Sequence, residues 1–163
     1  MKKFLFLIAF IATTVGASAQ IGDFSVLGNL GYQTSYERFT LGVQGRYNIT
    51  DKIRIAPDVM FFFPKDKVTG LDVNINAHYV FNFPGERFSV YPLAGIGMQN
   101  NFYGKDSDSN GKGKSYTSTK FAFNIGAGIT YNLGTRNYLN AEVKFQFADD
   151  DSAVLLLGYG FRF

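Results

Sequence analysis

His78 is the only imidazole in this chain of 163 residues and is the first candidate for catalysis. A general base needs a hydroxyl or carboxylate partner within hydrogen-bond reach. The sequence neighbours of His78 are Ala77 and Tyr79, and no His-x-Ser motif occurs, so the partner expected in a hydrolytic site is missing. We therefore expect His78 to be a structural residue, and we predict no catalytic residue.

Residues 106–111 read DSDSNG and match the first half of a calcium-binding loop, D-x-D-x-N-G. The second half does not match, because the twelfth position is Thr117 where the loop needs a bidentate Glu, and three lysines add positive charge nearby. The aspartates at 149–151 could supply oxygens, which keeps calcium as the weaker alternative. The main prediction is a polar loop tip with no metal and no cofactor.

The composition excludes several other kinds of chemistry. No Cys is present, which rules out disulfides, thiolate metal sites, iron–sulfur clusters and cysteine nucleophiles. The formal charge of +3 includes Lys2 and Lys3, which lie in a segment that we expect to be removed; without them, 14 basic side chains face 13 acidic ones. A nearly neutral chain without a basic stripe predicts no binding to nucleic acid.

The removed segment is a predicted signal peptide over residues 1–19. It has a Lys-Lys start, an apolar stretch from Phe4 to Ala12 and the small-residue site Ala17-Ser18-Ala19. The apolar stretch is too short for a membrane-spanning helix. We expect cleavage after Ala19 and a single domain over residues 20–163.

The elements that must position the remaining polar residues are β-strands. The chain has 18 Phe and 10 Tyr against 4 Pro, and from residue 23 onward apolar and polar residues alternate in segments bounded by turn-forming residues. After the signal peptide, no apolar run is long enough for a membrane helix. Eight strands are predicted, at 23–33, 38–49, 52–63, 70–83, 87–99, 119–133, 137–148 and 153–163.

Most of these segments have one apolar and one polar face. In 38–49, Phe39 and Leu41 lie on the apolar face, whereas Gln44 and Arg46 lie on the polar face. The fifth segment does not fit either phase, because Tyr91 and Leu93 fall on the face opposite Phe88, Val90, Ile96 and Met98. We leave its phase open.

Alternation fits both a transmembrane barrel and a soluble lipocalin-like barrel, which puts its apolar face inward. The connections favour the transmembrane barrel, because one end of the strands holds the longer ones and the other end only tight ones. We name these the loop end and the turn end. The loop-end connections lie near 34–37, 64–69, 100–118 and 149–152, and the turn-end connections near 50–51, 84–86 and 134–136.

The aromatic residues also favour a transmembrane barrel. If the strands alternate in direction, these residues gather at two heights, as they do at the two interfaces of a membrane. The loop-end group is Tyr32, Phe39, Phe61, Phe63, Phe121, Phe123, Phe145 and Phe147. The turn-end group is Phe24, Tyr47, Phe81, Phe83, Phe88, Tyr131, Tyr159, Phe161 and Phe163.

The last residues of the sequence resemble the C-terminal signal of bacterial outer-membrane barrels. Gly158, Phe161 and Phe163 match the spacing of that signal, although Leu156 stands where a polar residue is usual. The resemblance implies recognition by the barrel assembly machinery through Phe163.

Together these features make residues 20–163 resemble the small eight-stranded outer-membrane barrels of the OmpA/OmpX type, the outer membrane β-barrel or porin family of Gram-negative bacteria. The resemblance implies an all-β, eight-stranded antiparallel up-and-down transmembrane β-barrel. It also implies a place in the bacterial cell outer membrane, in contact with the lipid bilayer and lipopolysaccharide. Side chains fill the interior of a barrel of this size, so we expect no open channel.

The polar faces carry charges that must then lie inside the barrel. We expect them to form ion pairs that plug the lumen, because charges removed from bulk water are normally paired. A proton or ion path is the alternative. Arg46 and Arg54 are predicted neighbours near the turn end, with Asp58 and Glu142 as candidate partners. The whole set is Arg46, Arg54, Asp58, Asp72, Lys120, Glu142, Lys144 and Arg162.

Three functions remain open from the sequence. The leading hypothesis is a non-enzymatic outer-membrane barrel that anchors surface loops for envelope integrity or contact with a partner, with an extracellular partner at loop 100–118. The second is a barrel enzyme that modifies lipid A or phospholipid and depends on His78. The third is a soluble lipocalin-like carrier of an apolar ligand.

Overall fold

The computed structural model describes residues 22–83, 85–103, 116–149 and 151–163, so the predicted signal peptide lies outside the described residues. Among the described residues, no helix has the length and apolar character needed to cross a membrane. The described residues form nine strands: β1 (Phe24–Gln33), β2 (Arg38–Asn48), β3 (Ile53–Lys65), β4 (Val68–Tyr79), β5 (Phe81–Asn82), β6 (Phe88–Tyr103), β7 (Tyr116–Asn132), β8 (Asn137–Phe147) and β9 (Ser152–Arg162).

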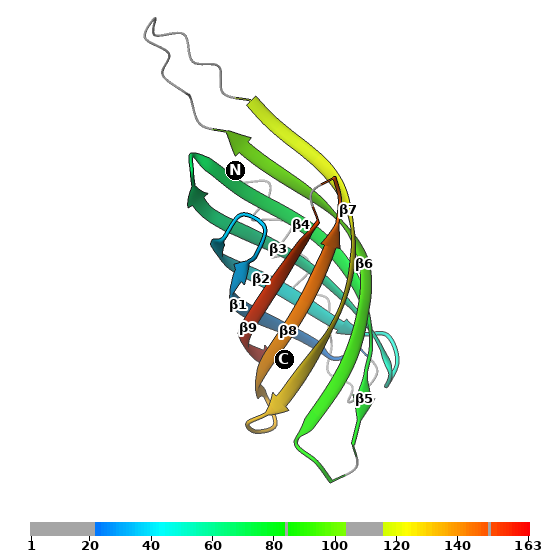
Figure 1. The fold of residues 1–163 in the computed structure, drawn as a ribbon. Helices are drawn as coiled ribbons and strands as arrows, with labels where there is room; N and C mark the ends of the chain where they lie inside the picture. Colours follow the sequence, from blue (N-terminus) through cyan, green and yellow to red (C-terminus); the bar gives the residue numbers. More distant parts are fainter. Residues whose placement is uncertain (1–21, 84, 104–115, 150) are drawn as a thin grey trace, which may run out of the picture.

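The strands form a closed antiparallel barrel (Figure 1). Consecutive strands pair with each other, except that β4 and β5 do not pair and both pair with β6 instead. Strand β1 pairs with β9 and closes the sheet. The short strand β5 continues β4 after a break at Val80, so the predicted segment 70–83 is one barrel strand in two pieces. The prediction of an eight-stranded up-and-down barrel is confirmed.

The barrel is apolar outside and polar inside. On β2, for example, Phe39 and Leu41 are exposed, whereas Gln44 and Arg46 are buried. Closure of β1 with β9 leaves no free sheet edge around the part of the barrel where all the strands pair. A lipocalin-like carrier needs an apolar interior, so that alternative is wrong for this molecule.

Strand β6 resolves the phase that the sequence left open. Ser89, Tyr91 and Leu93 point into the barrel and are buried, whereas Ile96 and Met98 are exposed on its outer face. The two large residues Tyr91 and Leu93 are therefore part of the lumen filling. The apolar pattern misled here because the lumen of this barrel also holds several large apolar side chains.

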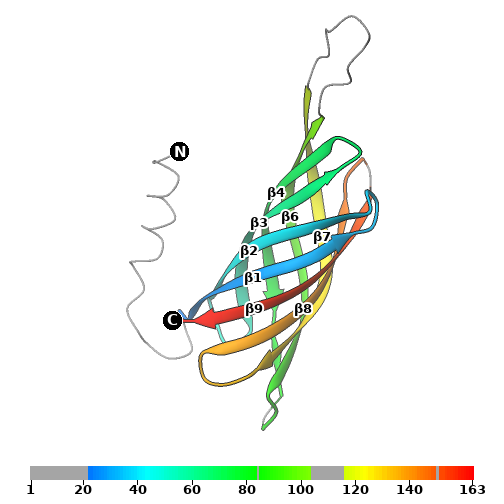
Figure 2. The same ribbon diagram turned by 90° about the vertical axis from the view of Figure 1, so that its left-hand side faces the viewer.

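The loop end differs from its prediction. The connection expected at 64–69 is a two-residue turn at Asp66 and Lys67, both with positive φ, because β3 and β4 continue into it. Strand β6 is also longer than expected, because it ends only at Tyr103. Strand β7 is longer too, because it begins already at Tyr116. The extra residues on this side of the barrel are thus largely strand, and they form a wall of β4, β6 and β7 that rises above β8 (Figure 2).

The seam between β1 and β9 ends in aromatic contacts at the turn end. The backbone N–H of Phe163 donates to the carbonyl oxygen of Phe24 over 3.0 Å. The Phe163 ring lies 5.9 Å from the ring of Phe24 and 5.3 Å from that of Phe161, measured between centroids. The last residue is therefore held to both seam strands.

Candidate functional site: the barrel lumen and its loop-end wall

A buried ion pair occupies the middle of the lumen. The Lys144 ammonium on β8 lies 2.9 Å from Oδ2 of Asp58 on β3, and both side chains are fully buried. Asn74 and Asn76 on β4 each donate an amide N–H to one oxygen of the same carboxylate, both over 2.7 Å. The carboxylate thus has three donors, as a buried charge requires.

A polar layer extends from this pair toward the loop end. The Asn124 amide on β7 donates to the side-chain oxygens of Asn74 and Asn76, over 2.9 and 3.0 Å. Asp72 accepts a hydrogen bond of 3.1 Å from Gln146 on β8. These bonds cross the barrel between β4 and the β7–β8 wall, so they hold opposite sides of the cylinder together.

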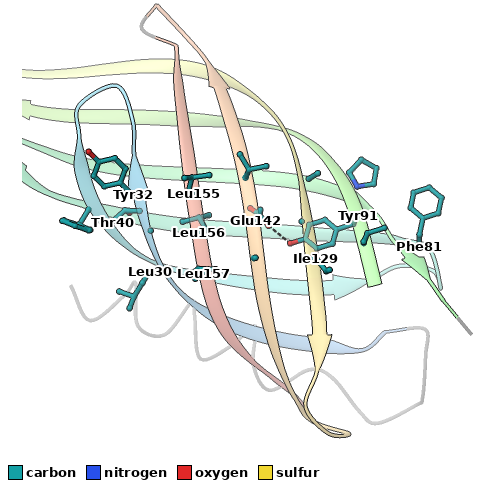
Figure 3. Close-up of a pocket in the computed structure, with 18 of the residues that line it drawn as sticks. Leu30, Tyr32, Thr40, Phe81, Tyr91, Ile129, Glu142, Leu155, Leu156 and Leu157 are labelled. Atoms are coloured by element: carbon teal, nitrogen blue, oxygen red, sulfur yellow. Dashed lines mark hydrogen bonds between the residues drawn. The ribbon is translucent and has the colours of Figure 1, made fainter. Parts of the chain in front are cut away.

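A second ion pair lies nearer the turn end. Nη2 of Arg46 is 3.7 Å from Oε2 of Glu142 and donates to the Tyr91 hydroxyl over 2.9 Å. That hydroxyl donates to Glu142 over 2.8 Å, which Figure 3 marks with a dashed line. Tyr91 therefore bridges the two charges. The predicted pairing of Arg46 with Glu142 is confirmed, whereas Asp58 pairs with Lys144 and not with either arginine.

Arg54 and His78 contact the same tyrosine ring. The Arg54 guanidinium lies 5.0 Å from the Tyr91 centroid, and the His78 ring stacks on Tyr91 at 4.5 Å with 10° between the planes. Neither nitrogen of His78 has a hydrogen-bond partner among the described residues. His78 is thus buried and stacked, and among the described residues it has no hydrogen-bond partner of the kind that orients a general base.

Arg38 closes the loop end of the lumen, and the sequence analysis missed it. Its Nε donates to Gln33 over 2.7 Å and its Nη2 to Asn101 over 2.9 Å. Its guanidinium also lies 4.6 Å from the centroid of Tyr36 and 4.7 Å from that of Phe62. The period-2 phase of β2, which places Arg46 inside, would have placed Arg38 inside as well.

The remaining predicted charges lie at the two ends of the lumen. Lys120 on β7 pairs with Asp149 at the loop end, over 3.6 Å. Arg162 on β9 lies near the turn end, where it donates to Asn132 over 2.6 Å and lies 4.7 Å from the Tyr138 centroid. Residues 106–111, the candidate half of a calcium loop, lie outside the described residues. No group of three potential metal ligands occurs in the described part of the chain.

An apolar hollow lies on the outer wall of the barrel, and Figure 3 shows most of its lining. Exposed leucines line it on one side and smaller residues on β6, β7 and β8 on the other. It lies along the apolar outer side of the barrel, and its lining also includes Tyr91 and Glu142, whose side chains are buried. The lining includes Leu30, Leu155, Leu157, Pro92, Ala127, Ala141 and Val143.

At the loop end, β6 and β7 continue beyond the last pair of β7 with β8, and β4 stays paired with β6 as far as Tyr103. We define the β6–β7 part of this extension, Gln99–Tyr103 and Tyr116–Ala122, as the loop-end ribbon. The rings of Tyr103 and Tyr116 stack across it, 4.5 Å apart with 12° between the planes. The Thr119 hydroxyl donates to the Asn100 side chain over 2.8 Å. The ribbon is therefore an ordered part of the rim.

A family model for the outer membrane protein beta-barrel domain matches residues 5–163, nearly the whole chain. The chain belongs to this family. Its place is therefore the bacterial outer membrane, and its outer surface carries a belt of exposed apolar residues. In such barrels the short turns face the periplasm, so the loop-end ribbon faces the outside of the cell.

Solved structures of other outer-membrane proteins share the fold of this outer-membrane barrel. The N-terminal barrel of OprF from Pseudomonas aeruginosa is 23% identical with a TM-score of 0.74, over 88% of this chain and 99% of that one. Ail from Yersinia pestis, solved with the heparin analogue sucrose octasulfate, is 19% identical with a TM-score of 0.61, over 87% and 97%. OprG from Pseudomonas aeruginosa is 15% identical with a TM-score of 0.67, over 88% and 97%. No curated protein matches the chain.

Proposed function

We propose that this protein is a non-enzymatic outer-membrane barrel that presents its loop-end ribbon, and the residues 104–115 that follow from it, to a partner outside the cell. The observation that carries the proposal is the height of the ribbon. Strand β7 continues for seven residues, Tyr116–Ala122, beyond its last pair with β8, Phe123 with Phe147. Residues on a rigid scaffold that project from it are where binding sites are usually found.

The composition of the lumen supports a structural role for the barrel itself. Four of its charges form two ion pairs, Arg46 with Glu142 and Lys144 with Asp58, and hydrogen bonds around them join opposite walls. The buried apolar residues Met60, Phe62, Val154 and Leu156 pack together in the same interior. A filled interior favours a scaffold over a solute channel.

The enzyme alternative has less support. A barrel that modifies lipid A or phospholipid needs a base with a partner close to its substrate. His78 is fully buried, stacked on Tyr91, and without a hydrogen-bond partner among the described residues. An unchanged lipid profile in a His78→Ala strain is the expected result, and loss of a lipid species in that strain would restore the enzyme hypothesis.

Two further partners belong to the proposal. The outer belt would contact the outer-membrane lipid bilayer and lipopolysaccharide, since its exposed side chains are apolar. The barrel assembly machinery would recognise the C-terminal strand through Phe163, whose ring lies on the outside of the seam.

Deletion of residues 104–117 tests the proposal, with a control that replaces 104–115 by the same residues in scrambled order. Gel migration of unboiled and boiled samples first shows whether each variant still closes its barrel. We expect both variants to fold, with any binding or envelope phenotype lost in the deletion. If the deletion folds and leaves every such phenotype unchanged, partner contact at this end is wrong.

A further inference from the structure

Two tyrosines form a stacked pair at the outer end of the loop-end ribbon. Tyr103 on β6 and Tyr116 on β7 lie directly opposite each other in the strand register, on either side of residues 104–115. Their ring centroids are 4.5 Å apart, with 12° between the ring planes. The two phenol rings are therefore in face-to-face contact at the point where the two strands meet those residues.

The pair is open to the medium outside the cell. Tyr116 is 62% exposed, and Tyr103 is partly exposed. The exposed ring of Phe121 belongs to the loop-end aromatic group, and Tyr116 lies about 16 Å beyond it along β7. Because the loop end faces the outside of the cell, a reagent in the external medium can reach both rings without entering the membrane or the lumen.

The composition makes tyrosine the main target of one-electron oxidation in this chain. The side chains that lose an electron most readily are those of Cys, Trp and Tyr, and the chain has no Cys and no Trp. Met is the next candidate for oxidation. Met60 is buried in the lumen, and Met98 lies on the outer face of β6 among other apolar residues. A tyrosyl radical formed at the loop end therefore has no Cys or Trp to which it could pass.

We propose that Tyr103 and Tyr116 are a site of oxidative modification, at which hydrogen peroxide and a one-electron oxidant of the haem peroxidase class join the two rings by a carbon–carbon bond. Each phenol loses one electron and one proton. The new bond forms between two ring carbons, each adjacent to the carbon that bears the hydroxyl. The hydrogen on each of these carbons then moves to the phenolic oxygen, which restores both aromatic rings. One hydrogen peroxide accepts the two electrons and two protons and becomes two water molecules.

The stack favours coupling within one chain over coupling between two chains. Directly opposite residues of an antiparallel pair keep their Cα atoms about 4.5–5.5 Å apart, so the two rings stay close while both are oxidised. Groups held together in this way react faster than groups that must first meet by diffusion. The bond would keep β6 and β7 joined even after a protease cuts within residues 104–115. This role goes beyond the partner contact proposed above and does not depend on it.

Peptide mapping of the refolded barrel in lipid nanodiscs tests the proposal. The protein is treated with a haem peroxidase and hydrogen peroxide, at a dose set by the coupling of free tyrosine in a separate sample. It is then unfolded and digested with trypsin. Cleavage after lysine and arginine releases peptides 88–105 and 115–120, which carry Tyr103 and Tyr116. We expect a linked species that is two hydrogen atoms lighter than these two peptides together.

Tyr103→Phe and Tyr116→Phe are the matched variants, because each keeps an aromatic ring in the stack but lacks the phenol that forms the radical. Both should fold, which gel migration of unboiled samples checks, and both should lose the linked species completely. A mixture of isotope-labelled and unlabelled barrel separates the two kinds of coupling. A linked species with one labelled and one unlabelled peptide comes from two chains, and we expect it to be rare.

Three results would overturn the proposal. The first is the absence of the linked species in the parent protein at the dose that couples free tyrosine. The second is a linked species whose labelled and unlabelled peptides are mixed at random, which would show coupling between copies. The third is a bond that fragmentation of the linked peptides places at Tyr91, the other tyrosine of peptide 88–105, because Tyr91 lies in the lumen.

Discussion

The Tyr91 side chain lies over Gly128, the residue directly opposite it across the β6–β7 pair. Tyr138 and Gly160 repeat this arrangement across β8 and β9. In both pairs the glycine leaves the space that the tyrosine ring occupies inside a narrow barrel. The ring of Tyr91 in turn carries the contacts of Arg46, Arg54 and His78, so this one glycine determines how the turn-end charges are arranged.

Gly128→Ala should therefore destabilise the barrel, because its new Cβ would overlap the Tyr91 ring. Overpacking of this kind costs about 1–3 kcal/mol. Gly28→Ala is the matched control, since Gly28 is exposed on the outer wall and a Cβ there meets nothing within 4 Å. Urea unfolding in lipid vesicles measures the difference. Equal stabilities of the two variants would show that Tyr91 moves without cost.

Lys144→Met should be strongly destabilising, because it leaves the Asp58 carboxylate buried without its counter-charge. Removing one partner of a buried ion pair costs about 3–5 kcal/mol. The double variant Lys144→Met with Asp58→Asn should recover part of this loss, since the amide needs no counter-charge. Equilibrium unfolding of the two single variants and the double variant completes the cycle. A double variant no more stable than Lys144→Met alone would contradict a dominant charge effect.

The Glu37–Lys65 pair at the loop end should respond to pH. The Lys65 ammonium donates a hydrogen bond of 2.5 Å to Glu37 and holds the pKa of that carboxyl below its usual value. Between the folded pKa of Glu37 and its ordinary value, the unfolded chain binds more protons than the folded one. The contribution of the pair to folding stability is therefore complete above the ordinary pKa of Glu, and it is lost as the pH falls through the folded pKa.

NMR titration of the Glu37 carboxyl checks this prediction. Its midpoint should lie below the usual range in the parent protein and return upward in Lys65→Met. High salt should reduce the difference, because both side chains are exposed to solvent. An identical midpoint with and without Lys65 would mean that the pair does not persist in solution.

Phe163→Ala should separate assembly in the cell from folding in vitro. If the assembly machinery reads the last residue, the variant should accumulate less folded barrel in cells. After refolding in detergent it should still close, because the backbone seam of β1 with β9 is retained. The heat-modifiable gel band measures both. Phe147→Ala removes another exposed ring, at the loop end, and should assemble normally.

The sequence predicted the barrel, its closure and most strand boundaries, because a membrane barrel needs alternation on every strand. It predicted less of the lumen. Alternation shows that Asp58 and Lys144 both point inward, but their pairing depends on the stagger between β3 and β8, which no local pattern records. Tyr91 and Leu93 escaped prediction because a lumen filled by side chains admits large apolar residues alongside polar ones.

The height of the loop-end ribbon also escaped prediction, for a different reason. Gly, Asn and Lys between 99 and 118 are turn-forming or polar residues, so they read as a loop by composition. Above the membrane both faces of a strand meet water, and the apolar alternation that reveals a strand is no longer required. Strand pairing there is maintained by the adjoining segment within the bilayer.

The β1–β9 seam has a consequence for biosynthesis. Ser25 pairs with Arg162, so the first strand of the barrel must wait for the last strand before the cylinder is complete. A chain that lacks β9 leaves one edge of β1 and one edge of β8 without a pairing strand. If such a chain entered the membrane, it would carry backbone groups without hydrogen bonds into lipid. We therefore expect insertion to follow export of all the barrel strands, and a stop codon within β9 should yield a chain that periplasmic proteases degrade instead of a smaller barrel.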